Sequence, residues 1–346
     1  MTIASGFTSA QEPIAETKSI AKVSRGQYLN GTNADPEFKT LLHGDTKRVD
    51  LTPSIGTELK GVQIADLNDA QLNEIALLVA ERGVVFFRDQ ELSRDQHLDF
   101  GRKFGSLHIH PVAPGPEGYP EIVCPSGGVK GLPTELNKTR ADTWHTDVSF
   151  DVVSPSFSIL QLRKVPPTGG DTIWANGYSL YDELSPVLQH FLETLTGIHS
   201  GEGFVNLSKL TGVPPVYEIP VATEHPVIRT NPITNQKALY VNPGFTKSIK
   251  NLTAVESDTL LDFLFNHIKT TTKAQVRWSW TANTVAIWDN RSTLHVAVND
   301  YEHEEAGSRY GERVTVVGAE RPYFDPINST TEKEVKAKRR IEKQSI

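Results

Sequence analysis

Cysteine is nearly absent from this sequence, which has 346 residues and a single cysteine, Cys124. An internal disulfide is therefore impossible, and the chain does not look like a secreted protein stabilised by bridges. Long apolar segments are missing as well. No window approaches the roughly 18 apolar residues that a membrane span requires, and residues 1–13 lack the apolar stretch of a signal peptide. We therefore expect a cytoplasmic protein without a membrane partner.

Basic residues are also few relative to acidic ones. The chain has 35 Lys and Arg against 42 Asp and Glu, which gives a formal net charge of −7 at pH 7. Because binding to phosphate backbones needs a net-basic surface or patch, we expect no nucleic-acid partner. The remaining partners that we expect are a small acidic substrate and further copies of the same chain in a homo-oligomer.

The density of apolar residues divides the chain into three segments. Residues 1–45 are rich in Ser, Thr, Gly and Asn and are expected to form a flexible lead-in. The 38% of hydrophobic residues, with 14 Phe, 9 Tyr and 5 Trp, suffice for one large packed domain, which we place at residues 46–325. Residues 326–346 form a charged tail, and we interpret its basic run as a solvated helix or a frayed end.

Short β-type runs separated by turn residues predict a mainly β fold with helical decoration, either a β-sandwich or a jelly roll. Asn68 and Gln71 form a capping-box pattern at the start of one helix, and a second helix is expected from Ser93. Further helices are predicted at 180–195 and 254–268. Strands are predicted at 84–87, 157–162, 172–174, 226–229, 238–241, 275–280, 285–288 and 313–317. The segment 111–143 has little periodicity and is expected to be a loop that closes over a site.

The pattern His-x-Asp or His-x-Glu occurs four times, starting at His43, His97, His145 and His303. Two His and one carboxylate are typical ligands of a redox-active iron with open positions, and residues i and i+2 of a strand point to the same side. The pair at His97 lies in a predicted helix, where the two side chains diverge. The pairs at His43 and His303 lie in a turn and in an acidic loop. His145 and Asp147 alone have a strand-like context, and a surface His–Asp pair is the alternative.

A third ligand must come from a distant part of the chain. His295 stands in the strand-like run 294–298, after a predicted strand and turn at 287–291. A His in an apolar strand is more often a core residue whose hydrogen bonds are all made. His295 becomes a candidate metal ligand only in combination with the residues that follow it.

Arg309 and Arg313 are four residues apart, a spacing that puts both side chains on one face in a strand and also in a helix. Two adjacent guanidinium groups repel each other unless an anion lies between them, and Glu312 would face the other way. A small dianion is the economical partner, because Arg binds carboxylate or sulfonate groups with two hydrogen bonds. Two surface arginines are the alternative.

Two other segments can add to an anion site. The Gly169–Gly170 turn leads into a strand and can place the Thr172 hydroxyl beside an anion. His108 and His110 have alternate spacing, so both can face one cavity, although a surface or supporting role for His110 is the alternative.

In this order, the residues resemble the taurine dioxygenase family of Fe(II)/2-oxoglutarate-dependent oxygenases, including its fungal-type sulfonate dioxygenases. The likeness covers about Val49 to Phe324. The segments that carry it are Phe104–Val112, Trp144–Val148, Thr168–Thr172, Trp288–His295 and Arg309–Gly318.

The resemblance implies a double-stranded β-helix, a form of jelly roll, and an enzyme that uses Fe(II), 2-oxoglutarate and O2. The iron ligands that it implies are His145, Asp147 and His295. Thr172 and Arg309 match positions that hold the distal carboxylate of 2-oxoglutarate. His110 and Arg313 match positions that hold a substrate sulfonate.

Three positions depart from those that receive the amine of taurine: Ala113, Arg140 and Ala141. We therefore expect a small organosulfonate whose far end is not an ammonium. Hydroxylation next to sulfur would release sulfite and an aldehyde, with succinate and CO2 as co-products. The alternatives are the same chemistry on an alkyl sulfate ester or another small acid, such as aryloxy-acid cleavage, desaturation or a biosynthetic oxidation, and a jelly-roll binding protein without turnover.

Overall fold

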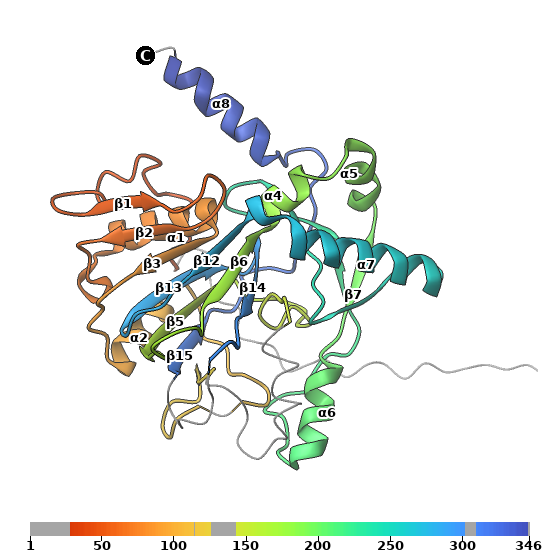
Figure 1. The fold of residues 1–346 in the computed structure, drawn as a ribbon, viewed down its shortest axis with the longest axis horizontal. Helices are drawn as coiled ribbons and strands as arrows, with labels where there is room; N and C mark the ends of the chain where they lie inside the picture. Colours follow the sequence, from red (N-terminus) through yellow and green to blue (C-terminus); the bar gives the residue numbers. More distant parts are fainter. Residues whose placement is uncertain (1–27, 114, 126–142, 302–308, 345–346) are drawn as a thin grey trace, which may run out of the picture.

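The computed structural model of the protein describes residues 28–113, 115–125, 143–301 and 309–344. As the sequence predicts, the fold is mainly β with helices on the outside (Figure 1). The strands are β1 (Lys47–Asp50), β2 (Thr57–Lys60), β3 (Val84–Phe87), β4 (Ile122–Val123), β5 (Phe157–Lys164), β6 (Thr172–Asn176), β7 (Thr196–His199), β8 (Thr223–Pro226), β9 (Ile228–Thr230), β10 (Lys237–Leu239), β11 (Thr246–Ile249), β12 (Gln275–Trp278), β13 (Thr284–Asp289), β14 (Thr293–Ala297) and β15 (Tyr310–Thr315). The helices are α1 (Asp69–Arg82), α2 (Arg94–Arg102), α4 (Gly177–Asp182), α5 (Pro186–Glu193), α6 (Glu202–Thr211), α7 (Ala254–Thr270) and α8 (Glu332–Gln344), with the 3-10 helices η1 (Ile64–Asp66) and η2 (Thr272–Ala274).

One layer is a large sheet with the strand order β1-β2-β3-β13-β5-β15-β4. Neighbouring strands in this sheet run antiparallel, except that β2 runs parallel to β3. Alternate residues of a strand point to opposite faces, so this sheet serves two cores. In β3, Val85 and Phe87 pack against α1 and α2, while Val84 and Phe86 pack on the other face.

A small sheet with the order β12-β6-β14 contributes to the second core. There the ring of Phe86 stacks on Trp278 with 4.0 Å between centroids, and it meets Trp174 edge-on at 5.3 Å. Trp174 also contacts Trp288 of β13 at 5.8 Å. These aromatic contacts join the large sheet to the small one and give β14, which carries His295, a firm backing.

The first two predicted helices are confirmed at their capping residues. Asn68 and Gln71 form a complete capping box for α1, and Ser93 and Gln96 form one for α2. Gly83 ends α1 with φ 73°, a conformation that favours glycine.

Two other elements were each predicted as one continuous segment, and in both cases the structure has two. The helix expected at 180–195 is two helices, α4 and α5, because Ser185 caps a new helix and Pro186 occupies its first turn; proline cannot continue a helix but suits its start. The strand expected at 226–229 is divided between β8 and β9. Pro226, which lacks an N–H for the ladder, is the last residue of β8.

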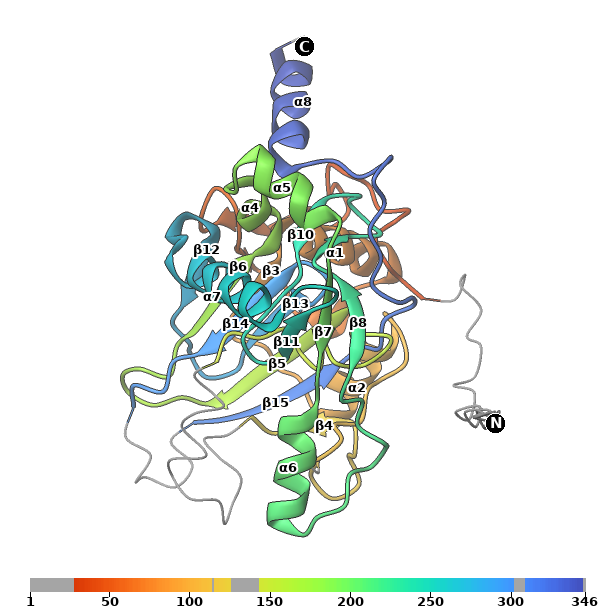
Figure 2. The same cartoon turned by 90° about the vertical axis from the view of Figure 1, so that its right-hand side faces the viewer.

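The described part of the N-terminal segment packs on α1. Phe38 and Leu41 are buried in the first core, and the Leu41 N–H donates to the Glu74 carboxylate at 2.6 Å. At the other end, α8 confirms the helical interpretation of the tail and projects from the body (Figure 2). The division into three segments stays a prediction, as does the closing loop, of which residues 114 and 126–142 lie outside the described residues. None of the described helices is long and apolar enough to cross a membrane.

Glu312 ties β15 to its surroundings on the face opposite Arg313, as expected. Its fully buried carboxylate forms ion pairs with Arg94 at 2.7 Å and with Arg163 at 2.8 Å, and it accepts a hydrogen bond from Tyr310. Burial disfavours the charged form, but these donors outweigh it and hold the pKa of Glu312 below its usual range.

We predict that Glu312→Gln lowers the free energy of unfolding by about 2 kcal/mol, because it leaves two arginines without a counter-charge. Urea unfolding of both proteins measures this, with Asp99→Asn, which removes an exposed pair with Arg102, as a control expected to change stability by less than about 0.5 kcal/mol. In the wild type this contribution is present above the pKa of an unfolded glutamate and is lost as the pH falls through the lowered pKa of the folded state. Equal effects of the two variants would contradict the structural role of Glu312.

Candidate active site

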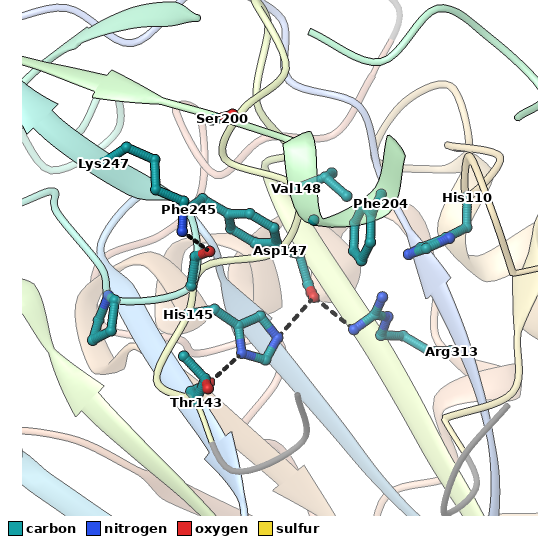
Figure 3. A pocket seen from close by; sticks show the side chains of 13 residues that line it. His110, Thr143, His145, Asp147, Val148, Ser200, Phe204, Phe245, Lys247 and Arg313 are labelled. Carbon is teal, nitrogen blue, oxygen red and sulfur yellow. Dashed lines mark hydrogen bonds and ion pairs between the residues drawn. The ribbon is translucent and has the colours of Figure 1, made fainter. Parts of the chain in front are cut away.

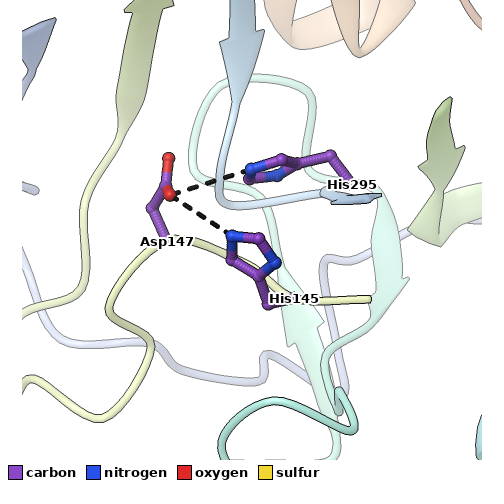
Figure 4. A group of neighbouring side chains, drawn as sticks. All are labelled: His145, Asp147 and His295. Atoms are coloured by element: carbon purple, nitrogen blue, oxygen red, sulfur yellow. Dashed lines mark ion pairs between the residues drawn. The ribbon is translucent and has the colours of Figure 1, made fainter. Parts of the chain in front are cut away.

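His145 and His295 are joined through their backbones. The N–H of each residue donates to the carbonyl of the other, at 3.0 and 2.8 Å, in an isolated antiparallel bridge. Such a pair of bonds places two side chains next to each other, and the ring centroids lie 4.2 Å apart. The expected strand ends there, since Asp147 already belongs to a turn in which Val148 has a φ of 36°. The turn, rather than strand alternation, brings Asp147 toward the two rings (Figure 4).

The three side chains form a group that can hold a metal ion. Asp147 Oδ1 lies 3.7 Å from His145 Nε2 and 3.8 Å from His295 Nε2, and the ligand atoms all lie within 4.8 Å of one another. His145 Nδ1 is 2.8 Å from the Thr143 carbonyl, to which it donates, so Nε2 is left with a free lone pair. Burial lowers the pKa of both histidines, which favours the neutral, ligating form. Two neutral imidazoles and a carboxylate fit iron(II) with open positions.

The Asp147 carboxylate is held on both of its oxygens. Oδ2 accepts a hydrogen bond from Ser158 Oγ at 2.6 Å, and Ser158 in turn accepts from Asn290 Nδ2 at 2.9 Å. Oδ1, which faces the histidines, accepts from Arg313 Nη1 at 2.6 Å. Burial alone would raise the pKa of Asp147, but the positive charge of Arg313 and the hydrogen bond from Ser158 hold it well below its usual value. The carboxylate is therefore charged and fixed in direction.

A cavity of about 320 Å³ opens beside this group (Figure 3). Besides His145 and Asp147, the side chains that shape it are His110, Val148, Phe204, Phe245, Lys247 and Arg313. It combines an apolar wall with a few charged and polar groups, which is the usual composition of a site for a small molecule.

His110 is a neutral hydrogen-bond donor in this cavity. Its Nδ1 accepts from the backbone N–H groups of Val112 and Ala113, at 3.3 and 3.0 Å. Burial and the nearby positive charge of Arg313 lower the pKa of His110 to about 3. The proton of the neutral ring is therefore on Nε2, which is free to donate to a ligand. His108, expected to share the cavity, instead contacts Tyr217 Oη and the Asp151 carboxylate and does not line it.

Arg309 and Thr172 lie outside the lining of the cavity. Arg309 is buried and donates to the carbonyls of Gly170 and Pro125, at 3.1 and 3.2 Å. Thr172 lies two residues after Gly170, and its Oγ1 accepts a hydrogen bond from Trp280 Nε1 at 3.0 Å. Gly169 and Gly170 both have positive φ, 77° and 71°, the conformation that the glycines of the expected turn would allow. A Cβ on Gly170 would lie 3.2 Å from Arg309 Cδ, so the positive φ and the close arginine both favour glycine here.

Several residues of the site were not found from the sequence. Ser158, Phe204, Phe245 and Lys247 carry no local pattern that marks them. Asn290 belongs to a segment that drew attention through its likeness to a family, but its contact with Ser158 spans 132 residues and has no sequence signal. Arg140 and Ala141, two of the three departures from the taurine site, lie outside the described residues.

Comparisons with known proteins agree with this geometry. Residues 47–315 match the family model described as "Taurine catabolism dioxygenase TauD, TfdA family". The chain belongs to this family. An α-ketoglutarate-dependent sulfonate dioxygenase of Saccharomyces cerevisiae is 38% identical over 84% of this chain and 72% of its own length. An α-ketoglutarate-dependent sulfate ester dioxygenase of Pseudomonas putida is 36% identical over 76% of this chain and 87% of its own. The crystal structure of a taurine dioxygenase from Burkholderia xenovorans superposes with a TM-score of 0.67, at 35% identity, over 82% of this chain and 93% of that one.

Membership of the TauD/TfdA family sets the class of reaction. The protein is a dioxygenase dependent on 2-oxoglutarate (α-ketoglutarate), with Fe(II) as its metal and O2 as its oxidant, as the sequence predicted. The alternative of a binding protein without turnover is thereby set aside.

We predict that Ser158→Ala weakens metal binding about 10- to 100-fold, because residues that orient a ligand contribute on this scale. Titration of the apoprotein with Fe(II) under anaerobic conditions, or with Co(II) as a spectroscopic probe, measures the change without any turnover. Ser208→Ala, on the outer helix α6, is the control and should leave the affinity unchanged. Equal affinities for the two variants would show that Asp147 needs no support from Ser158.

Proposed function

We propose that the protein hydroxylates a small organosulfonate at the carbon next to sulfur, within a double-stranded β-helix formed by its two main sheets. The observation that carries this proposal is that Arg313 and the neutral donor His110 line one cavity, which also contains Asp147. The name of the yeast relative, a sulfonate dioxygenase, supports the same substrate class. Action in the cytoplasm and assembly as a homo-oligomer stay predictions from the sequence.

In this proposal the polar residues divide into three sets. His145, Asp147 and His295 hold the iron, Thr172 and Arg309 hold the distal carboxylate of 2-oxoglutarate, and His110 and Arg313 hold the sulfonate. Arg309 is suited to its task because it is buried and forms no ion pair with any described carboxylate. Its charge therefore calls for an anionic ligand.

The sulfonate site follows from the donors that are free. Among the described residues the Arg313 guanidinium forms one hydrogen bond, to Asp147, so its remaining N–H groups are left for a ligand, and His110 lines the same cavity with its Nε2 proton free. A tetrahedral anion with three oxygens can accept from both at once. Such an anion beside Arg313 would lie next to Asp147, which brings the neighbouring carbon close to the metal.

Iron(II), when bound, supplies the activation of O2 that couples decarboxylation of 2-oxoglutarate to oxidation of a C–H bond. One oxygen atom of O2 enters succinate and the other becomes the hydroxyl that replaces hydrogen on the substrate carbon. The C–S bond then breaks with its electron pair on sulfur, which leaves as sulfite, while the hydroxyl loses its proton and becomes the carbonyl of an aldehyde. The chain's part is to orient the two anions and, with Phe204 and Phe245, to limit water in the cavity.

We predict that Fe(II) and 2-oxoglutarate give succinate and sulfite in equal amounts when alkanesulfonates are added to the full-length protein. The panel should include alkyl sulfate esters, because the name of the Pseudomonas relative favours them as a second candidate; they would release sulfate instead of sulfite. If no sulfonate and no sulfate ester raises succinate above the rate without substrate, the proposed function is rejected.

Exchange of each arginine tests the division between the two anions. Arg313→Met should raise KM for the sulfonate by about tenfold or more and change KM for 2-oxoglutarate little, since a charged hydrogen-bonded pair is lost at one ligand only. Arg309→Met should do the opposite. Because Arg313 also contacts Asp147, the metal affinity of each variant is measured in parallel. Equal effects of both variants on both ligands would contradict the assignment.

A further inference from the structure

Lys247 lines the active-site cavity, although nothing in the sequence marked it. It lies in β11, where the pairing with β7 is irregular. Thr246 is opposite His199 and Ser248 is opposite Ile198, so Lys247 is the extra residue of a β-bulge. Bulges re-aim a side chain and are frequent beside active sites. Here the bulge turns a lysine of an otherwise outer strand toward the cavity.

The positions of the two cations in the cavity define its ends. Figure 3 shows Lys247 on the side opposite Arg313 and His110, with the Phe245 ring between them. Phe204 and Val148 add to the apolar middle. A ligand that spans this cavity meets an anion site at Arg313, then a short apolar passage, and then a second cation.

The Lys247 ammonium is available for a ligand. Among the described residues its one hydrogen bond goes to the Gly244 carbonyl at a long 3.4 Å, and no carboxylate lies within ion-pair distance of it. An ammonium has three protons to donate, so most of its capacity is left to solvent or to a bound molecule.

When the charges of the metal, 2-oxoglutarate, a sulfonate and the protein side chains are counted, Lys247 has no negative charge to balance it. The two positive charges of the metal and that of Arg309 are balanced by Asp147 and the two carboxylates of 2-oxoglutarate. Arg313 is balanced by the sulfonate. Asp147 is the sole carboxylate among the described residues that line the cavity, so a substrate with one negative charge would leave Lys247 unpaired.

We infer that the substrate is a short organosulfonate with a second anionic group, of the carboxylate kind, at its far end, which Lys247 binds. This inference rests on the proposed function, because it takes the sulfonate to lie at Arg313 and His110. It also explains the lost amine site. Ala113 offers only its backbone N–H to His110, and Lys247 would repel an ammonium at the far end of taurine. Because Lys247 is exposed, its attraction is screened and acts mainly on selectivity.

The test compares three sulfonates of equal chain length that end in a carboxylate, a neutral carboxamide or an ammonium. Sulfite release by the full-length enzyme with Fe(II) and 2-oxoglutarate gives kcat/KM for each. The wild type should prefer the carboxylate over the carboxamide by about three- to fivefold, as expected for one exposed ion pair, and should disfavour the ammonium. Lys247→Met should bring the carboxylate-to-carboxamide ratio to about one, and Lys247→Glu should reverse the order in favour of the ammonium.

Lys250→Met is the matched control. Lys250 lies three residues further on, is exposed and pairs with Glu224 at 2.7 Å, so its loss should leave the ratio as in the wild type. A ratio that is the same in the wild type and in Lys247→Met overturns the inference, as does a wild-type preference for the ammonium. In both cases turnover of the carboxamide-ended sulfonate would still support the proposed function. Absence of sulfite from all three compounds, and from the wider panel, would instead reject the proposed function itself.

Discussion

The buried carboxylate of Asp147 is the constraint on which the rest of the site depends. A charge with 2% of its surface exposed is tolerated only where hydrogen bonds and opposite charges surround it. Ser158 reaches it from β5 and is itself held by Asn290, which follows β13, and Arg313 reaches it from β15. His295 approaches from β14. The contacts of this one side chain thus bring elements of both sheets together, and its Oδ1 faces the two histidines.

Local parts of the fold could be predicted because their causes are local. Asn68 and Ser93 indicate the starts of two helices, because a capping box acts over three residues. Gly170 indicates a change of chain direction, because its positive φ is a conformation that other residues avoid. The break at Pro186 was missed although its signal was present, since the apolar spacing on both sides continues through it. Where an element is set by its partners, as at the boundary of β8 and β9, the sequence alone does not fix it.

The metal group could be located from spacing, but the reason for its geometry could not. A strand was expected to align His145 with Asp147, whereas a single backbone bridge to His295 and the turn after it do so. The bridge spans 150 residues of chain, a relationship that no periodicity expresses. For the same reason, Ser158 and Lys247 could not be predicted as site residues from the sequence. The first acts through a contact with Asp147, and the second is aimed by a bulge that exists only in the pairing of two strands.

The two ends of the cavity are built on different kinds of structure. His295 belongs to β14, which is backed by the aromatic core, where Trp288 lies 4.9 Å from the His295 ring, and Arg313 belongs to β15 inside the large sheet. Rigid backing of this kind suits groups that must hold a metal and an anion in fixed relation. Lys247, Phe245 and Phe204 come from a bulge, a loop and the outer helix α6, which contribute less to the core. Substitutions there disturb stability less, so this end can change its substrate while the reaction stays the same.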